Sequence, residues 1–394
     1  MRYTSRKAPL FSLTSGPVEI YPEVLRAMSR QLPYDFDPYY QDFYERVSNQ
    51  LKTAMRSDSY PIVLQADPIL GAEAGAASLI AEGDVVLNLV SGVYGKGFGD
   101  FARLHAGEVI EHAVPFNEAI DPEDARRILL ARPEIAVVAV LHHDTPSGTV
   151  NPVHAIGKVV REVSDAVLLV DATSAFGGMD SQPTEIGADF YITGSSKCLG
   201  APPGLTMIYA SERGWKKMEA NARAPRNSVL SVVDWRDSWS REKPFPFTTS
   251  GAEIHALEAA LDLYLDEGPE QVWKRHALTA AMFRSGVKAL GLELWAARES
   301  IASPSCTTVK VPEGLTDATI LTAVRSMFGV VMAPGRGETK GKLIRVGHMG
   351  LTANPSFALL ALSALGGALN EIGFAAPTGT AVEAALAELS AHGR

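Results

Sequence analysis

The fold is decided by residues 166–210, which read AVLLVDATSAFGGMDSQPTEIGADFYITGSSKCLGAPPGLTMIYA. Three short apolar runs in this stretch, AVLLVD, DFYITG and LTMIYA, are rich in β-branched and aromatic residues and are separated by turn-forming residues, which predicts buried strands. Two of the runs end in polar residues, at Asp171 and at Thr193-Gly194. In an open α/β sheet the ligand crevice lies beyond the carboxyl ends of the strands, so these positions are the first candidates for chemistry.

The same alternation of short apolar runs and helical patterns extends from about Pro61 to Tyr209. Continuous apolar runs suit strands that are covered on both faces, and helical crossovers between them imply a mainly parallel sheet. We therefore predict an α/β fold in which a mainly parallel, doubly wound sheet forms a large domain beside a smaller α+β domain. Further strand ends at the predicted ligand edge are Ala66-Asp67, Ser91-Gly92 and His143-Asp144.

The carboxyl-terminal third of the chain has a different pattern. A stretch rich in Trp, Pro and Phe, from Val232 to Ser250, interrupts the alternation before a helical pattern that begins near Ala252. Mixed strand and helix patterns of a smaller unit follow. The predicted domains are an N-terminal segment that packs with the small domain (1–20), a large domain (21–265) and a small C-terminal α+β domain (266–394).

Composition excludes several classes of protein. The chain has 394 residues, of which 46% are hydrophobic, enough to fill the cores of roughly two or three domains. Its 36 Lys and Arg against 45 Asp and Glu give a net charge of −9, so no overall positive field exists to hold nucleic acid or an anionic membrane. No apolar run approaches the ~20 residues of a spanning helix, and the amino end lacks a secretion signal, so we expect a cytoplasmic protein. Only two cysteines, Cys198 and Cys306, argue against a disulfide framework or a cysteine zinc site.

One lysine stands at the predicted ligand edge. Lys197 lies in a loop of small residues, TGSSKCLGAPPG, after a buried strand. A lysine near apolar strands loses its proton readily, as Schiff-base formation requires, but this loop alone favours an ordinary solvated lysine. Asp171 changes that reading, because a carboxylate at a neighbouring strand end suits a pyridine nitrogen that must stay protonated as an electron sink.

The order of these features, followed by RVGHMG with Arg345, resembles the class V family of fold type I aminotransferases, which depend on pyridoxal phosphate. The resemblance extends from SGPVEIYPEVL near the amino end to the terminal helices. It implies that Tyr94 in SGVYGKGFG stacks on the pyridine ring and that Arg345 and Arg336 hold the substrate carboxylate through paired hydrogen bonds. Arg336, in its glycine-flanked loop, also fits an ordinary solvated arginine.

The resemblance also implies further contacts and a partner subunit. Thr145 and Ser147 in HHDTPSGTVNP correspond to residues near the polar edge of the ring, and FPFTTSGAE, which contains Phe247, corresponds to a segment that the partner subunit contributes. We therefore expect a homodimer or homotetramer. His142 and His143 are adjacent rather than spaced as metal ligands, so no metal site is predicted.

The sequence departs from the family at the turn that usually binds the cofactor's phosphate. This turn is normally rich in Gly and Ser and opens a helix whose N–H groups hold the anion, but here it reads QADPILGAEAGAA. Asp67 followed by Pro68 is a typical helix start, and its carboxylate would deprive a phosphate of hydrogen bonds worth roughly 1.5 to 3 kcal/mol each. Ser196 stands where phosphate-binding members commonly have Gln. We therefore expect no tightly bound cofactor.

Within the family, the chain is most similar to the branch that acts on unphosphorylated vitamers, through HHDTPSG, SVVDW, KPFPFT and GRGET-x-GKL-x-R-x-GHMG. We expect a transaminase that moves the amino group of free pyridoxamine to pyruvate, giving pyridoxal and L-alanine in vitamin B6 degradation. The vitamers are then substrate and product, with pyridoxal as a Schiff base on Lys197 and Asp67 as acceptor for the vitamer hydroxyl. That branch has Glu at the position of Asp67, which is one methylene shorter.

Two alternatives stay open at this point. The first is an ordinary class V aminotransferase that uses pyridoxal phosphate to move amino groups between alanine or serine and glyoxylate or pyruvate. The second is a vitamer-binding protein without activity, which the joint presence of Lys197, Asp171 and Arg345 disfavours.

Overall fold

A seven-stranded sheet forms the centre of the computed structural model, which describes residues 8–243 and 245–392. All neighbouring strands are parallel except β10, which runs antiparallel to both β2 and β9. In spatial order the strands are β2 (Ile62–Gln65), β10 (Leu205–Ala210), β9 (Phe190–Gly194), β8 (Val167–Asp171), β5 (Ile135–Leu141), β3 (Val85–Val90) and β4 (Glu108–Ala113). The predicted α/β class with a mainly parallel sheet is confirmed.

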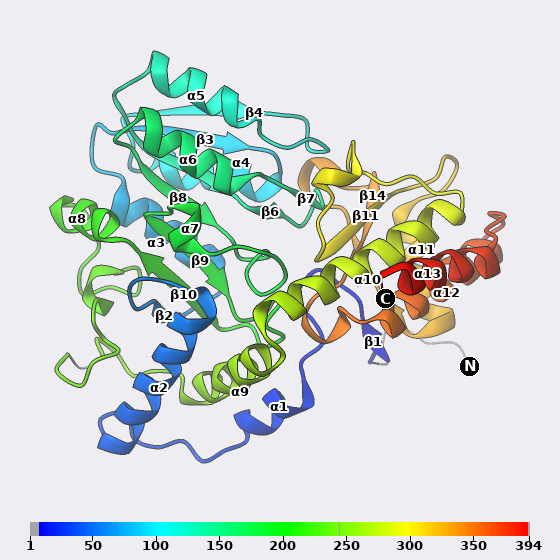
Figure 1. Cartoon of the computed structure of the whole chain (residues 1–394), viewed down its shortest axis with the longest axis horizontal. Coiled ribbons are helices and arrows are strands. Elements are labelled where there is room, and N and C mark those ends of the chain that lie inside the picture. The colour runs from blue at the N-terminus through cyan, green and yellow to red at the C-terminus, as the bar shows by residue number, and fades with distance from the viewer. Residues whose placement is uncertain (1–7, 244, 393–394) are drawn as a thin grey trace.

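Helices cover both faces of this sheet (Figure 1). Helices α3 and α4 pack on each other on one face, and α5 and α6 pack on each other on the opposite face, as right-handed crossovers between parallel strands require. This double cover explains why the strand sequences are continuously apolar rather than alternating. The helices are α3 (Pro68–Leu79), α4 (Val93–Arg103), α5 (Pro122–Ala131), α6 (Val153–Val163), α7 (Pro183–Ile186) and α8 (Glu212–Ala220).

The chain enters and leaves this part through long helices. Helices α1 (Pro22–Met28) and α2 (Pro38–Met55) pack against α9 (Gly251–Glu267). Helix α10 (Pro269–Ala289) follows directly and reaches the smaller, carboxyl-terminal part. The helix predicted to begin near Ala252 is therefore α9.

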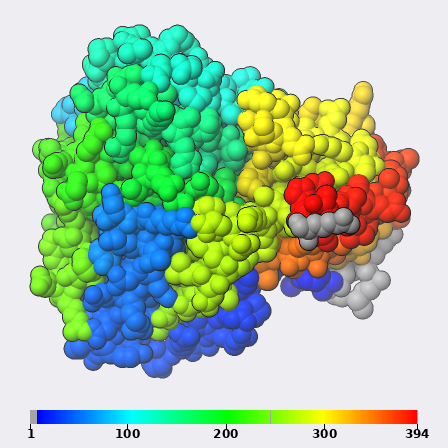
Figure 2. Space-filling model, viewed as in Figure 1, coloured from blue at the N-terminus to red at the C-terminus, as the bar shows by residue number. Residues whose placement is uncertain are grey.

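The smaller part has a core of its own, which includes Leu13, Val309 and Leu365. A three-stranded antiparallel sheet in the order β11-β14-β13 packs there with three helices beside α10. Figure 2 shows these elements, yellow to red, gathered on one side of the molecule. They are β11 (Cys306–Lys310), α11 (Asp317–Phe328), β13 (Ala333–Pro334), β14 (Leu343–Gly347), α12 (Pro355–Glu371) and α13 (Thr378–His392).

The amino-terminal segment lies against this smaller part, because β1 (Phe11–Ser12) pairs in parallel with β12 (Val330–Val331). The domain limits at residues 20 and 265 stay a prediction. Among the described residues, no helix has both the length and the apolar character needed to span a membrane.

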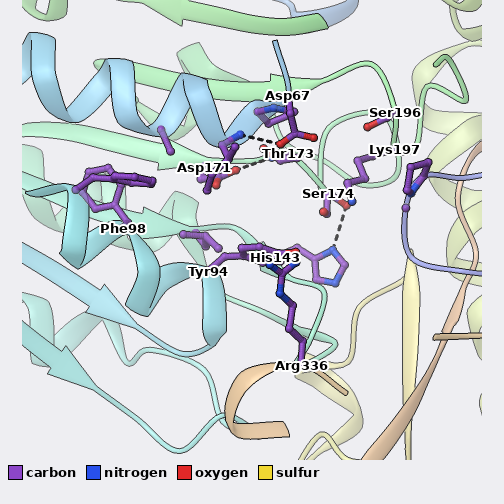
Figure 3. Close-up of a pocket in the computed structure, with 17 residues that line it drawn as sticks. Asp67, Tyr94, Phe98, His143, Asp171, Thr173, Ser174, Ser196, Lys197 and Arg336 are labelled. Atoms are coloured by element: carbon purple, nitrogen blue, oxygen red, sulfur yellow. Dashed lines mark hydrogen bonds between the residues drawn. The ribbon is translucent and has the colours of Figure 1, made fainter. Parts of the chain in front are cut away.

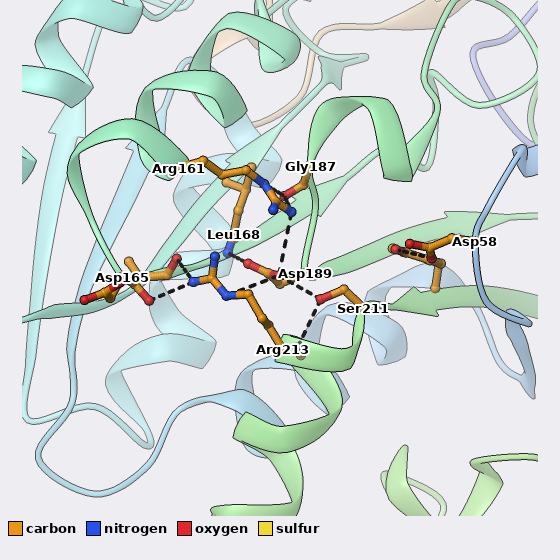
Figure 4. A network of polar contacts seen from close by, with 11 residues as sticks. Asp58, Arg161, Asp165, Leu168, Gly187, Asp189, Ser211 and Arg213 are labelled. Carbon is orange, nitrogen blue, oxygen red and sulfur yellow. Dashed lines mark hydrogen bonds and ion pairs between the residues drawn. The ribbon is translucent and has the colours of Figure 1, made fainter.

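A dense polar network closes the sheet edge at the amino ends of the parallel strands (Figure 4). Asp189, directly before β9, is buried, and its carboxylate accepts hydrogen bonds from the Leu168 N–H at 3.0 Å and the Ser211 hydroxyl at 2.7 Å. The guanidinium groups of Arg161 and Arg213 lie 4.0 and 3.9 Å from the same carboxylate. Each carboxylate oxygen therefore has a donor, and the charge has two counter-ions.

Candidate active site

A cavity of about 350 Å³ opens at the other edge of the sheet, beyond the carboxyl ends of the parallel strands. Side chains from both parts of the molecule are directed into it (Figure 3). Five residues that the sequence analysis selected line this cavity: Asp67, Tyr94, Asp171, Lys197 and Arg336. The cavity thus lies where the carboxyl ends of the parallel strands predict a ligand crevice.

Lys197 follows β9 and projects its amine into the cavity, where Nζ donates a hydrogen bond to the Ser15 carbonyl oxygen at 3.1 Å. Burial lowers the pKa of this amine, and the nearby positive charge of Arg345 acts in the same direction, while Asp67 opposes both. The neutral amine needed for nucleophilic attack or proton transfer is therefore more accessible than for a surface lysine. Gly16 makes this approach possible, because a Cβ atom there would lie 2.2 Å from Lys197 Nζ.

Asp171 is the last residue of β8 and faces the same cavity. Its Oδ1 accepts a hydrogen bond from the Thr173 N–H at 2.9 Å. Burial raises the pKa of this carboxyl, while hydrogen bonds from Thr173 and the charge of Lys197 oppose the rise. The Asp171 carboxylate has one backbone hydrogen-bond donor and can therefore still bind a cationic group. A protonated ring nitrogen is such a group.

Tyr94 lies in the first turn of α4 and is held there by Asp144, which the sequence analysis did not select as a site residue. The Asp144 carboxylate accepts from the Tyr94 N–H at 2.7 Å and from the Ser147 N–H at 3.2 Å. The N-cap position of α4 is Gly92, and a Cβ atom there would lie 2.2 Å from Asp144 Cγ. Asp144 thus caps the helix from a different loop, and burial raises its pKa to about 6.

Asp67 caps α3 as its sequence predicted. The backbone of Asp67 is extended, Pro68 is the first helical residue, and the carboxylate accepts from the Ile69 N–H at 3.1 Å. The side chain borders the cavity above Thr173 and Asp171 in Figure 3. One carboxylate oxygen therefore serves the helix end, and the other is available to a ligand hydroxyl.

The two arginines come from the smaller part of the molecule. Arg336 reaches the cavity and donates from Nη1 to the Tyr94 hydroxyl at 3.0 Å. Arg345 does not line the cavity, because its Nε donates to the Pro334 carbonyl oxygen at 2.8 Å and its Nη1 to the Ser15 hydroxyl at 3.0 Å. Ser15 therefore bridges Lys197 and Arg345, and this contact joins distant segments that no local pattern relates.

Three further predicted residues lie outside the cavity lining. Thr145 is buried, and its carbonyl oxygen lies 3.9 Å from the Cys306 sulfur. Ser147 is buried as well, and its hydroxyl has no hydrogen-bond partner among the described residues. Phe247 is 38% exposed and packs against Trp235 with ring centroids 6.0 Å apart. Their roles at the ring and at the partner interface stay predictions.

His143 lines the cavity, although the sequence analysis named it only as a strand end and not as a site residue. Its Nδ1 lies 3.1 Å from the Ser174 carbonyl oxygen and 3.1 Å from the Ser305 hydroxyl. Burial lowers the pKa of this imidazole to about 4, so it is neutral near pH 7. His143 lies two residues beyond the end of β5, at the strand end that the sequence had placed at the ligand edge. Within the described ranges, no cluster of His, Cys, Asp and Glu is suited to hold a metal ion.

Comparison with known proteins decides the family. The family model for class V aminotransferases matches residues 106–353 of this chain.

The chain belongs to the class V aminotransferases.

Its relatives in this family match nearly the whole chain. The pyridoxamine–pyruvate transaminase of Mesorhizobium japonicum is 56% identical over 391 residues, which cover 99% of each chain. The crystal structure of pyridoxamine-pyruvate aminotransferase from Mesorhizobium loti has a TM-score of 0.98 and 55% identity, covering 99% of this chain and 100% of that chain. The (S)-ureidoglycine–glyoxylate transaminase of Bacillus subtilis is 30% identical, covering 95% of this chain and 94% of its own. The predicted fold type and enzyme class are confirmed.

The expectation of no tightly bound cofactor is wrong, because class V aminotransferases depend on pyridoxal phosphate and this chain is one of them. That expectation treated the start of α3 as filled by Asp67. In the structure the Asp67 side chain accepts one hydrogen bond, from the Ile69 N–H, and Arg336 places a positive charge at the same cavity. A single capping aspartate therefore does not decide whether an anionic group can be held nearby.

The described residues fit the pyridine ring of this cofactor. Asp171 supplies a carboxylate for the ring nitrogen, Tyr94 an aromatic face, and Lys197 an amine whose pKa is lowered by burial. One cavity thus contains a carboxylate, an aromatic ring and an amine, which are the groups that pyridoxal chemistry requires.

Proposed function

We propose that this class V aminotransferase transfers the amino group of free pyridoxamine to pyruvate, giving pyridoxal and L-alanine in vitamin B6 degradation. The observation that carries the proposal is that Asp67, Asp171 and Lys197 line the same cavity. Pyridoxamine presents a hydroxymethyl group, a ring nitrogen and an aminomethyl group, and these three side chains match them in chemistry. The full-length similarity to the Mesorhizobium transaminases supports the same substrates.

In this proposal the large domain binds and orients the vitamer. Asp171 holds the ring nitrogen in its protonated form, and Asp67 accepts a hydrogen bond from the hydroxymethyl group. Tyr94 covers one face of the ring. The ring, when bound, accepts the electron pair that is released at the reacting carbon.

Lys197 moves the proton in this proposal. Once the amine of the vitamer has replaced the keto oxygen of pyruvate, which leaves as water, the neutral Lys197 amine would take a proton from C4′ and return it to the α-carbon of the keto acid. Hydrolysis of the C4′–N bond would then release L-alanine and pyridoxal. Because burial lowers its pKa, the amine gives up its proton more readily than the amine of a surface lysine. The Ser15 carbonyl oxygen, 3.1 Å from Nζ, gives the amine a fixed resting position between turnovers.

The arginines hold the keto acid. Arg336 already projects into the cavity, and Arg345 has its Nε and Nη1 engaged by Pro334 and Ser15. A guanidinium fork binds a carboxylate through two parallel hydrogen bonds. Arg345 contacts the pyruvate carboxylate once its Nη1 leaves the Ser15 hydroxyl, whereas Arg336 needs only a rotamer change.

The test compares substrates of the purified protein. L-alanine and pyridoxal are measured after mixing with pyridoxamine and pyruvate, and in parallel with pyridoxamine 5′-phosphate and pyruvate. Equal amounts of alanine and pyridoxal from the unphosphorylated pair support the proposal. Activity only between alanine or serine and glyoxylate, with added pyridoxal phosphate, would instead establish the ordinary class V reaction.

We also propose that the active species is a cytoplasmic homodimer or homotetramer. Free, buried thiols at Cys198 and Cys306 suit a reducing compartment. Large apolar side chains are exposed along α1, the connection to α2 and the first turn of α2, with Tyr34 at 69% and Tyr39 at 65% exposure, and exposed apolar surface of this kind marks interfaces. The other members of this patch are Leu25, Leu32 and Phe36. Light scattering should give the mass of a dimer or tetramer, and replacing Tyr34 and Tyr39 with Glu should shift it to the monomer, whereas Leu104→Glu should not.

A further inference from the structure

One of the contacts between the two parts of the molecule at the cavity joins Tyr94 to Arg336. The Tyr94 hydroxyl accepts a hydrogen bond from Arg336 Nη1 at 3.0 Å, and the guanidinium carbon lies 5.4 Å from the centroid of the Tyr94 ring. Figure 3 shows Arg336 rising from the smaller part toward Tyr94 at the cavity floor. Tyr94, which is proposed to face the ring, therefore contacts Arg336, which is proposed to bind the keto acid.

Both partners are held firmly at the backbone. The Tyr94 N–H is bound by the buried Asp144 carboxylate at 2.7 Å. On the other side, the Thr339 hydroxyl accepts from the Arg336 N–H at 3.0 Å and donates to the Arg336 carbonyl oxygen at 2.9 Å, which closes a tight turn. The relative position of Tyr94 and Arg336 is thus set by two rigid anchors, and only their side chains remain adjustable.

A second contact joins the same two segments but is exposed. Lys96 of α4 pairs with Glu338 of the turn, and their side chains are 57% and 45% exposed. Exposed pairs contribute little to stability, typically below about 1 kcal/mol. The hydroxyl of Tyr94 is therefore the contact that can fix the direction of the Arg336 guanidinium, and Lys96 offers a control for simple loosening of the loop.

We propose that the Tyr94 hydroxyl is a positioning group for Arg336, which couples occupation of the ring site to binding of the keto-acid carboxylate. The inference rests on the proposed function. A ring stacked on Tyr94 restrains its side chain, and the restrained hydroxyl holds the guanidinium at the cavity, where the carboxylate arrives. Without this hydrogen bond, the exposed arginine samples many rotamers and must be ordered by the keto acid itself.

The decisive variant is Tyr94→Phe, which keeps the aromatic face and removes only the hydroxyl. We expect KM for pyruvate, and KM for L-alanine in the reverse direction, to rise about five- to tenfold, which is less than a buried hydrogen bond to a charged group is worth, because Arg336 is exposed. The dissociation constant of pyridoxamine and kcat should stay within about twofold, since stacking and the proton-transfer groups are intact.

A double-mutant cycle and two controls complete the test. In an Arg336→Ala background, Tyr94→Phe should have no further effect on KM for pyruvate, because the coupled partner is gone. Lys96→Ala, in the same pair of segments, and Tyr60→Phe, whose hydroxyl contacts Asn49 away from the cavity, should leave that KM unchanged.

Three results would overturn the inference: an unchanged KM for pyruvate in Tyr94→Phe, additive effects in the double variant, or an equal rise in Lys96→Ala. Failure of the proposed function is distinguishable from these, because the wild-type protein would then form no alanine from pyridoxamine and pyruvate.

Discussion

Two aspartates on adjacent strands of one sheet differ in what surrounds them. Asp189 precedes β9 at one edge, where two hydrogen-bond donors and two arginines meet its carboxylate. Asp171 ends β8 at the opposite edge, where its carboxylate receives the Thr173 N–H and otherwise faces a cavity. Asp189 is buried and Asp171 is half-buried at the cavity, and only the Asp189 carboxylate has both oxygens hydrogen-bonded by the protein.

This difference in hydrogen bonding suits Asp189 to stabilising the fold and Asp171 to binding a ligand. A buried charge without partners is destabilising, so it persists only where something else compensates for it. The charge of Asp189 is compensated within the chain, and in the proposed function the charge of Asp171 is compensated by the ring nitrogen of the vitamer. Substitutions at the two edges should therefore affect different measurements, activity at one and stability at the other.

The largest effect is expected at the cavity edge from Lys197→Ala. Alanine formation should fall by at least about 10³-fold, because the variant lacks the group that moves the proton. Pyridoxamine binding, followed by ring fluorescence, should stay within about threefold. Lys217→Ala, which removes a lysine paired with Asp84 at 2.7 Å outside the cavity, should leave turnover unchanged. Transamination by Lys197→Ala at the wild-type rate would end the role assigned to this lysine.

Asp171→Asn should reduce kcat/KM for pyridoxamine by about 10²-fold or more, since an amide cannot hold the ring nitrogen in its protonated form. The free energy of unfolding in urea should not fall, because the substitution removes a half-buried charge whose demand the protein itself leaves unmet. A loss of stability together with full activity would show that Asp171 is a structural carboxylate like Asp189.

Asp189→Ala tests the opposite edge. It leaves the Leu168 N–H, the Ser211 hydroxyl and two guanidinium groups without their shared acceptor, and the free energy of unfolding should fall by about 3 kcal/mol. We expect kcat of the folded protein to be unchanged within about twofold. A reduced kcat at wild-type stability would remove the distinction between the two edges.

The smallest effect is expected from substitution of Asp144. This residue combines a structural role, as the cap of α4, with a buried position beside the cavity. Its pKa in the folded chain is about 6, whereas an unfolded aspartate titrates near 4. Between these values the folded state binds more protons, so its stability falls as pH rises. The free energy of unfolding of the wild type relative to Asp144→Asn should fall by about 2 kcal/mol from pH 4 to pH 7 and stay level above that. An offset that does not change with pH would contradict the raised pKa.

The residues that the sequence identified share one property, which is a position at the carboxyl end of a predicted strand. Lys197, Asp171 and Asp67 were found this way because strand ends converge in any sheet of this type. Tyr94 and Arg336 came from the family resemblance rather than from spacing. The structure places all five at one cavity.

The residues that were missed depend on contacts between distant segments. Ser15 reaches Lys197 and Arg345 across the interface of the two parts, and neither strand pattern nor charge indicates this. Asp144 was noted as a strand end, but its capping of α4 follows from β3 and β5 being neighbours in the sheet, an order that the sequence does not state. The cofactor prediction failed because it generalised from one helix end to a whole cavity.

The close contact between Gly16 and Lys197 can help to recognise enzymes of this type among uncharacterised protein sequences. Lysines in loops of small residues are common, so a sequence search that uses this loop alone would find many unrelated proteins. Any side chain at position 16 would displace the amine, because even a methyl group has no room there. A search that also requires the glycine at position 16 would retain the proteins in which the lysine amine has room to reach the cavity.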